Sequence, residues 1–362
     1  MAFVAPDRTR SNLSSVFSRA ILRLLVFGPL IFALSLSAFA DSTDAFYRGK
    51  TVTMLIGSPP GATYDIWARL VARHLGAHLP GSPAVVAQNM PGAGSTVMTN
   101  YVYNVAPQDG TFIGLMNSTN PFEPMFGVSE AKFDPLKINW LGSPAQDTAV
   151  VMVWHDVPVD TIEMAKTRAI RFAATSVNGT AAFFVRVFNA VLGTKFELVY
   201  GYPGLSDAML AMERGEVDGH PSPYWSYLKT AKPDWISDKK IKFLLQYGRR
   251  PNPELPDVPF ARDLLTNDAD RALLDAAMAQ LTIGYPFFIR PGVPPDRVEA
   301  MRRAFAATFR DADFLADAKS QNLDIDPLAA SEVQQTLSDT YRMPSAALDR
   351  LRRLYQPAAD QK

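Results

Sequence analysis

The chain has 362 residues, of which 48% are apolar and 20% charged, and it contains no cysteine. Lysine plus arginine and aspartate plus glutamate both number 36, so the formal net charge is zero. This composition is typical of a folded globular protein of about two domains. It argues against nucleic-acid binding, which needs a basic excess, and it excludes disulfides, zinc–thiolate centres and cysteine nucleophiles.

Residues 1–40 have the layout of a secretory signal peptide. Four arginines precede an apolar run over Leu24–Leu36, and Ala38-Phe39-Ala40 supplies a small-x-small cleavage pattern. An uncleaved membrane anchor is the alternative, but the run is shorter than the ~20 apolar residues of a membrane span. We therefore expect cleavage after Ala40 and export to a bacterial periplasm. Losing four arginines and one aspartate gives the mature chain a net charge of −3.

The first part of the mature chain alternates short β-rich runs with helical patterns. Strands are predicted at 51–56, 84–88 and 111–116, and helices are predicted from about 63 to 79 and from 95 to 105. This order predicts a parallel sheet with right-handed crossover connections.

The same alternation restarts after residue 149. Strands are predicted at 150–153, 171–174, 196–199, 217–219 and 241–246, and helices at 181–192, 206–214 and from a capping box at 160–163. The proline-dense stretch 250–259 is predicted to be extended. A strand-like run at 281–289 and helices opening at Asp296 and Ser331 follow it. The chain therefore looks like two successive α/β halves.

Enzyme, cofactor and metal motifs are weak in this sequence. It has no G-x-S-x-G elbow, H-E-x-x-H motif or phosphate-binding P-loop, and the glycine-rich run 92–97 lacks the third glycine of a dinucleotide fingerprint. His74 and His78 have metal-ligand spacing, but the helix is expected to end near them, which favours surface side chains. We expect no catalytic residue, no metal and no cofactor.

Several loops that join a strand to a helix combine glycine with short polar side chains. They are 61–63, 91–96 and 178–180. Glycine lets a backbone approach a ligand closely, and a helix N-terminus favours anions. Each loop alone is also explained by ordinary capping and turn chemistry. Together, at the carboxyl ends of strands in two halves, they predict a shared anion site without an arginine.

Short motifs spread from Phe46 to about Asp349 resemble those of the substrate-binding receptors of tripartite tricarboxylate transporters, the Bug-type periplasmic receptors. The matching segments are 46–50, 64–69, 88–94, 106–111, 174–180, 200–204, 215–218 and 255–259. The resemblance implies an α/β, two-lobed Venus-flytrap fold of type II with two crossover strands. Lobe I would comprise 41–147 and 252–362, and lobe II 148–251, with hinges near 143–150 and 246–253.

By the same resemblance, the protein would be a monomeric, non-enzymatic receptor that captures a small organic anion, chiefly a carboxylate, and delivers it to separate membrane transporter subunits. The implied ligand contacts are Gly61, Ala62, Thr63, Asp65, Asn117 and Ser118 in lobe I, and Ser176, Asn178, Gly179, Thr180, Tyr202 and Gly204 in lobe II. The first loop departs from the usual glycine cluster, since Pro59 and Pro60 offer no N–H donor.

Three questions stay open in the sequence. Asp65 could contact the ligand or only stabilise the first helical turn, and the second role is favoured. The receptor could serve a membrane sensor instead of a transporter. A periplasmic enzyme using Asp65 or His220 is a further alternative, but no paired nucleophile and base accompanies either residue. The ligand itself is not identified by the sequence.

Overall fold

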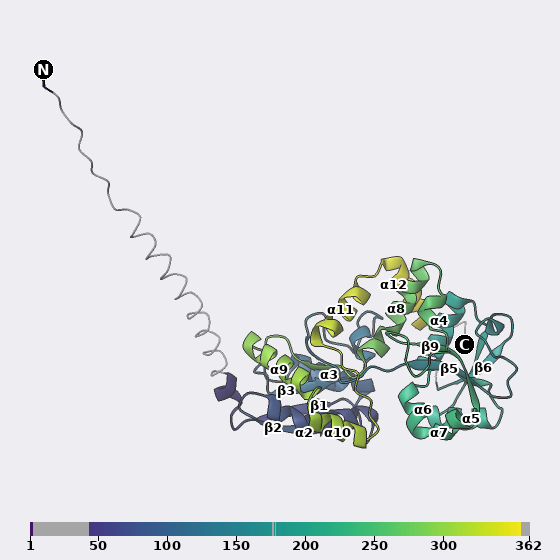
Figure 1. The fold of residues 1–362 in the computed structure, drawn as a ribbon, viewed down its shortest axis with the longest axis horizontal. Coiled ribbons are helices and arrows are strands. Elements are labelled where there is room, and N and C mark those ends of the chain that lie inside the picture. Colours follow the sequence, from purple (N-terminus) through teal and green to yellow (C-terminus); the bar gives the residue numbers. More distant parts are fainter. Residues whose placement is uncertain (3–42, 176, 178, 356–362) are drawn as a thin grey trace.

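The computed structural model describes residues 1–2, 43–175, 177 and 179–355. Two five-stranded sheets, each with its own helices, form two lobes (Figure 1). The predicted signal peptide and its cleavage site lie outside the described residues. Across the described part of the chain, no helix has the length and apolar character needed to cross a membrane.

The first sheet has the strand order β2-β1-β3-β10-β4. Its strands are β1 (Thr51–Ile56), β2 (Ala84–Asn89), β3 (Phe112–Leu115), β4 (Asn139–Gly142) and β10 (Phe287–Ile289). β1 pairs in parallel with β2 and β3, as the β-α-β order predicts, whereas β10 is antiparallel to β3 and β4. The connecting helices are α2 (Thr63–His78) and α3 (Thr96–Asn104), which follows the short turn η1 (Ala93–Ser95).

The second sheet has the order β7-β6-β8-β5-β9. Its strands are β5 (Ala149–Trp154), β6 (Ile170–Ala174), β7 (Phe196–Tyr200), β8 (Gly219–His220) and β9 (Ile241–Tyr247). Its helices are α4 (Thr180–Leu192), α5 (Leu205–Glu213), α6 (Trp225–Ala231) and α7 (Pro233–Ser237). β6 is parallel to β7 and β8, and β5 is antiparallel to β8 and β9. Both sheets therefore mix a parallel part with antiparallel strands next to the crossings.

The chain passes between the sheets twice. Residues 143–148 lead from β4 to β5, and the segment after β9 returns the chain to β10. The remaining elements are the short turns η2 (Asn120–Phe122), η3 (Met164–Lys166) and η4 (Ala261–Leu264) and the helices α8 (Asp268–Ile283), α9 (Pro295–Thr308), α10 (Ala312–Ser320), α11 (Ala330–Tyr341) and α12 (Ser345–Tyr355). In Figure 1, α8, α11 and α12 lie along the upper side, where the two lobes adjoin.

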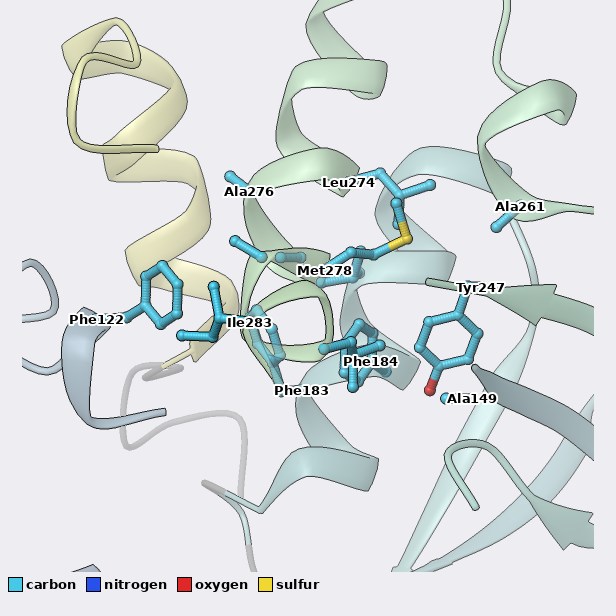
Figure 2. Close-up of a cluster of buried hydrophobic side chains, with 14 of the residues drawn as sticks. Phe122, Ala149, Phe183, Phe184, Tyr247, Ala261, Leu274, Ala276, Met278 and Ile283 are labelled. Atoms are coloured by element: carbon cyan, nitrogen blue, oxygen red, sulfur yellow. The ribbon is translucent and has the colours of Figure 1, made fainter. Parts of the chain in front are cut away.

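The largest buried apolar cluster runs through both lobes. It includes Leu55 of the first sheet and Phe172 of the second. Figure 2 shows Met278 and Ile283 of α8 in this cluster, with Phe122 on one side and Phe184 on the other. The two lobes therefore share a continuous core along α8, and burial of this surface stabilises their arrangement.

Two local predictions are wrong. The capping box at 160–163 opens only the short turn η3, in which Thr161 Oγ1 accepts from the Met164 N–H at 3.3 Å. The proline-dense stretch is not extended but folds into successive turns, with Leu255 N–H donating to Asn252 O at 3.0 Å. Gln246 holds this segment through hydrogen bonds to the carbonyls of Leu255 and Val258.

Candidate ligand-binding site

Three helices begin just after the carboxyl ends of parallel strands. They are α2 after β1, α4 after β6 and α5 after β7, and each has an alanine or glycine as its N-cap residue, which makes no side-chain cap hydrogen bond. Within the described residues, no protein acceptor faces the first three amides of α2 or of α5. Such helix N-termini attract anions, so this edge of each sheet is suited to an anionic ligand.

Asp65 in the first turn of α2 is buried and fully hydrogen-bonded. Its Oδ2 accepts from Gly61 N–H at 2.8 Å, and its Oδ1 accepts from Arg69 Nε at 2.9 Å and Asn89 Nδ2 at 2.8 Å. Burial alone would raise the pKa of Asp65, but hydrogen bonds from Arg69, Gly61 and Asn89 outweigh it and hold the pKa below its usual value. The carboxylate thus ties the loop to α2 and β2.

The rest of the first loop surrounds this network. Gly61 adopts the left-handed backbone with φ of 80°, where a side chain would be strained. Ala62 is the N-cap of α2, and Thr63 is exposed as the first helical residue. Pro59 accepts from the Ala62 N–H at 3.3 Å, so the prolines shape a turn and donate nothing.

Asn117 and Ser118 follow β3 and adjoin the first turn of α2. The Asn117 side chain accepts hydrogen bonds from the N–H and hydroxyl of Thr119, both at 3.0 Å, which fixes a local turn. The buried Ser118 donates its N–H to the hydroxyl of Tyr64 at 3.0 Å. Tyr64 therefore joins two of the predicted ligand loops, a role that sequence analysis missed.

In the second lobe the structure describes four of the six predicted contacts. Ser176 and Asn178 lie outside the described residues. Gly179 is the N-cap of α4 with φ of −71°, a conformation open to any residue, so only its small size distinguishes it. Thr180 is the exposed first residue of α4, Gly204 is the N-cap of α5, and Tyr202 packs against the apolar cluster beneath α5.

Arg69 of α2 and Arg186 of α4 already have protein partners. Arg69 binds Asp65 and donates from Nη2 to Asn89 Oδ1 at 2.8 Å. Arg186 of α4 donates from Nε to Leu354 O at 2.6 Å and from Nη2 to Tyr355 O at 3.4 Å. Both guanidinium groups therefore hold the protein's own structure, and Nη1 of Arg186 is buried without a hydrogen-bond partner among the described residues.

Four polar side chains from distant parts of the chain gather where the crossings meet the first loop. We call Tyr64, Asp147, Tyr224 and Tyr285 the crossover cluster. The rings of Tyr64 and Tyr285 lie 5.1 Å apart, and Ser143 Oγ accepts from the Tyr285 N–H at 2.9 Å. Tyr224 forms a β-bridge with Ala149, directly after the first crossing. The sequence gives no local signal for this cluster, because its members are up to 221 positions apart.

Asp147 is a half-buried carboxylate with neutral hydrogen-bond partners. Its Oδ1 accepts from Thr148 N–H at 2.9 Å, and its Oδ2 accepts from the Ser226 hydroxyl. Burial raises the pKa of Asp147 to about 6, because these hydrogen bonds offset only part of the loss of water. Burial also raises the pKa of Tyr224 far above its usual value, with smaller contributions from Tyr64 and Asp147, so its phenol stays neutral.

Three of the histidines contact other groups of the protein. His220 is buried, its Nδ1 accepts from Ser222 N–H at 3.3 Å, and burial lowers its pKa to about 4, so the ring is neutral near pH 7. His74 and His78 are half-buried contacts to α10, where they meet Asp317 and Asp311, each at 3.0 Å. No group of three or more potential ligand side chains in the described part of the chain could hold a metal ion.

Comparison with known proteins shows similarity at the level of structure. No family model and no curated protein matches the sequence. A TctC solute-binding protein from Polaromonas superposes with a TM-score of 0.66 at 17% identity, covering 85% of this chain and 98% of the other. The periplasmic binding protein BugD superposes with a TM-score of 0.54 at 19% identity, covering 85% and 97%.

A third neighbour, MatC from Rhodopseudomonas palustris with bound malate, has a TM-score of 0.56 at 17% identity and covers 85% of this chain and 99% of the other. These neighbours are binding proteins, and each of them matches this chain over nearly its whole length. The chain therefore has the two-lobed α/β fold of periplasmic solute-binding proteins such as TctC and BugD.

Proposed function

We propose that the protein is a periplasmic solute-binding receptor that captures a small organic anion, a carboxylate, between its two lobes. It delivers this ligand to the membrane subunits of a tripartite tricarboxylate-type transporter. The observation that carries the proposal is the set of uncapped helix N-termini, α2 in one lobe and α4 and α5 in the other, at the carboxyl ends of strands.

The structural neighbours support a carboxylate ligand. MatC was solved with malate, and another R. palustris protein of this fold, at 17% identity and a TM-score of 0.55, was solved with adipate. From these neighbours we infer a carboxylate ligand for the present chain. We do not infer that this ligand is malate or adipate.

The proposed ligand contacts are those that the sequence indicates. They are Gly61, Ala62, Thr63, Asn117, Ser118, Ser176, Asn178, Gly179, Thr180, Tyr202 and Gly204, with Asp65 acting through the loop that it holds. The lobes are 41–147 with 252–362, and 148–251. The receptor acts as a monomer that closes about the crossings.

A thermal-shift screen tests the binding function. The exported protein is heated with mono-, di- and tricarboxylates, hydroxy and amino acids and aromatic acids, one at a time. A bound acid adds RT ln(1 + [L]/Kd), about 2.7 kcal/mol at a hundredfold excess over Kd, and so raises the melting temperature. Uncharged sugars and the diamine putrescine serve as controls. A protein that no acid stabilises at millimolar concentration would contradict the proposal.

Export is tested separately from binding. We expect the N-terminal sequence of protein recovered from the periplasm to begin at Asp41. A chain that still begins at Met1 and sediments with membranes would contradict export by a cleaved signal peptide.

A further inference from the structure

One ion pair links the two lobes through side chains that lie outside the proposed ligand loops. Lys229 Nζ of α6 lies 2.5 Å from Asp324 Oδ2, in the segment between α10 and α11. Leu228, next to Lys229, packs in the apolar core of the second lobe. Leu323 and Ile325, on either side of Asp324, pack against the core of the first lobe. The pair therefore joins two backbone segments that are each fixed to a different lobe.

Two other ion pairs reach the same acidic segment from the second crossing. Arg250 Nη2 lies 2.7 Å from Asp326 Oδ1, and Arg249 Nη2 lies 2.5 Å from Glu332 Oε1. Both arginines follow β9 directly, where the chain leaves the second lobe. Partners close to a hinge move little relative to one another, so the pair made by α6 is the one of the three that a rotation of the lobes disturbs most.

The Lys229 ammonium group is also held by the second crossing. Its Nζ lies 2.9 Å from Glu254 Oε2, and the same carboxylate accepts from Trp225 Nε1. Burial alone would lower the pKa of Lys229, but hydrogen bonds to Asp324 and Glu254 outweigh it and raise the pKa, so the group is charged near pH 7. Lys229 could follow a moving Asp324 only by giving up its contact with Glu254.

The proposed ligand loops are open to solvent in this conformation. Gly61 and Thr63 of the first lobe and Thr180 of the second are exposed, and a ligand held between the lobes would cover them. This conformation is therefore the open form of the proposed receptor. Closure rotates one lobe against the other, and an ion pair already in direct contact can then only lengthen.

We propose that the ion pair between Lys229 and Asp324 is a latch that stabilises the open form of the receptor and breaks as the lobes close on a ligand. The inference rests on the proposed function for its effect on ligand affinity, whereas its effect on the lobes can be measured without ligand. Any free energy that favours the open form raises the apparent dissociation constant, so the latch weakens binding.

The exposure of the two side chains limits the size of the effect. Lys229 is 28% exposed and Asp324 is 68% exposed. Ion pairs of this kind contribute modestly and are weakened by salt, so we expect changes of about two- to fivefold in the equilibrium between the two forms.

The first test measures affinity by calorimetry with the acid that stabilises the protein best in the thermal-shift screen. Asp324→Asn and Lys229→Met, which keeps the apolar stem of the lysine, should each bind this acid about two- to fivefold more tightly than wild type. The lysine variant separates a latch from a direct charge effect, because loss of a cation by itself would weaken the binding of an anion. The double variant should match Lys229→Met alone, because Asp324 acts through Lys229.

The second test follows the lobes without ligand, by single-molecule energy transfer. The chain has no cysteine, so Ala306→Cys on α9 and Ser237→Cys at the end of α7, both exposed, can carry one dye in each lobe. In this labelled protein, Asp324→Asn and Lys229→Met should each raise the ratio of closed to open molecules about two- to fivefold. Raising the salt concentration from about 20 to about 300 mM should have the same effect on the labelled parent and little effect on the two variants.

Asp160→Asn is the matched control for both tests. It removes an aspartate that is 69% exposed and lies 2.7 Å from Lys242, but both partners of this pair belong to the second lobe. We expect it to change neither the affinity nor the ratio of closed to open molecules. Melting temperatures of all variants show whether each one is folded.

The outcomes separate this inference from the proposed function. An unchanged or weaker affinity of both single variants overturns the latch and leaves the receptor function standing. A ratio of closed to open molecules that rises in neither variant, or that rises equally in Asp160→Asn, overturns it as well. If no acid of the screen binds, the proposed function itself fails, and the energy-transfer measurement alone decides about the latch. Should Lys229→Met not fold, Asp324→Asn and the salt dependence of the labelled parent decide.

Discussion

Asp65 and Asp147 show how the surroundings of one residue type determine its charge. Asp65 is buried and Asp147 half-buried, yet the pKa of Asp65 is lowered and that of Asp147 is raised. The difference is a cation, because Arg69 contacts Asp65 whereas Asp147 receives only neutral donors. Asp147 therefore destabilises the fold when ionised, and such a cost is often tolerated at functional sites.

Stability should depend on pH through Asp147 and His220 in opposite senses. The folded-state pKa of Asp147 is raised to about 6, so its contribution is most favourable below about pH 4 and is lost as pH rises through 6. The pKa of His220 is lowered to about 4, so its contribution is present above about pH 6.5 and is lost as pH falls toward 4.

Melting curves of single variants between pH 4 and 7.5 separate the two groups. Asp147→Asn should stabilise the protein by about 2 to 3 kcal/mol at pH 7.5 and by little near pH 4. His220→Gln should show its largest loss of stability at pH 7.5 and a smaller loss near pH 4. A stability difference from wild type that does not vary with pH would show that the residue does not titrate in this window.

The Thr180 hydroxyl should contribute directly to ligand affinity. Thr180 is exposed at the start of α4, and hydrogen bonds to a charged group contribute ~1.5–3 kcal/mol. Thr180→Ala should therefore weaken the best acid of the screen about ten- to hundredfold by calorimetry, with an unchanged melting temperature. Thr266→Ala, an exposed threonine just before α8, is the matched control. Equal affinities of both variants would remove Thr180 from the site.

At the scale of elements, periodicity predicted most of the two sheets. Strands β1 and β6 and helices α2 and α4 lie within a residue or two of their predicted positions. α8 was not predicted, although Asn267 is a recognisable N-cap that accepts from Asp270 N–H at 2.8 Å. β10 lies within the predicted strand-like run 281–289, whose first three residues instead end α8. The antiparallel pairing of β10 and the crossover cluster were out of reach, because they are set by tertiary contacts across more than 100 residues.

The end of α12 should depend on Arg186. The guanidinium of Arg186 binds the carbonyls of Leu354 and Tyr355, and the Tyr355 ring stacks on Phe126 at 4.2 Å and meets Phe183 edge-on at 5.7 Å. Arg186→Met keeps most of the apolar stem but removes these hydrogen bonds. We expect a loss of about 1 to 2 kcal/mol in the free energy of unfolding, without loss of ligand affinity.

Denaturant unfolding and calorimetry measure the two effects of Arg186→Met separately. The control is Arg271→Met, which removes an exposed ion pair with Asp268 and should change stability by less than about 0.5 kcal/mol. If Arg186→Met abolishes acid binding while stability is unchanged, a guanidinium clamp recognises the ligand and the amide-based site is wrong.

At the scale of the whole molecule, the shared core constrains how the lobes can move. The apolar cluster along α8 contacts both lobes (Figure 2). α12 adds Tyr355, whose ring contacts Phe126 of one lobe and Phe183 of the other. Breaking this packing would expose apolar surface, which costs about 25 cal/mol per Å². The lobes should therefore rotate about this side of the molecule, with the loops of the proposed site on the moving side.

Small-angle scattering with and without ligand tests this closure. We expect the radius of gyration of the protein to fall when the best acid of the screen is added at saturation, because a ligand held by both lobes favours the closed state by its differential affinity. Thr180→Ala is the matched control: at an acid concentration between the two dissociation constants, wild type should contract and the variant should not. The contraction should also survive Arg271→Met, which lies away from the loops. An unchanged scattering profile of the saturated wild-type protein, with binding shown by calorimetry in the same sample, would mean that the acid binds without lobe closure.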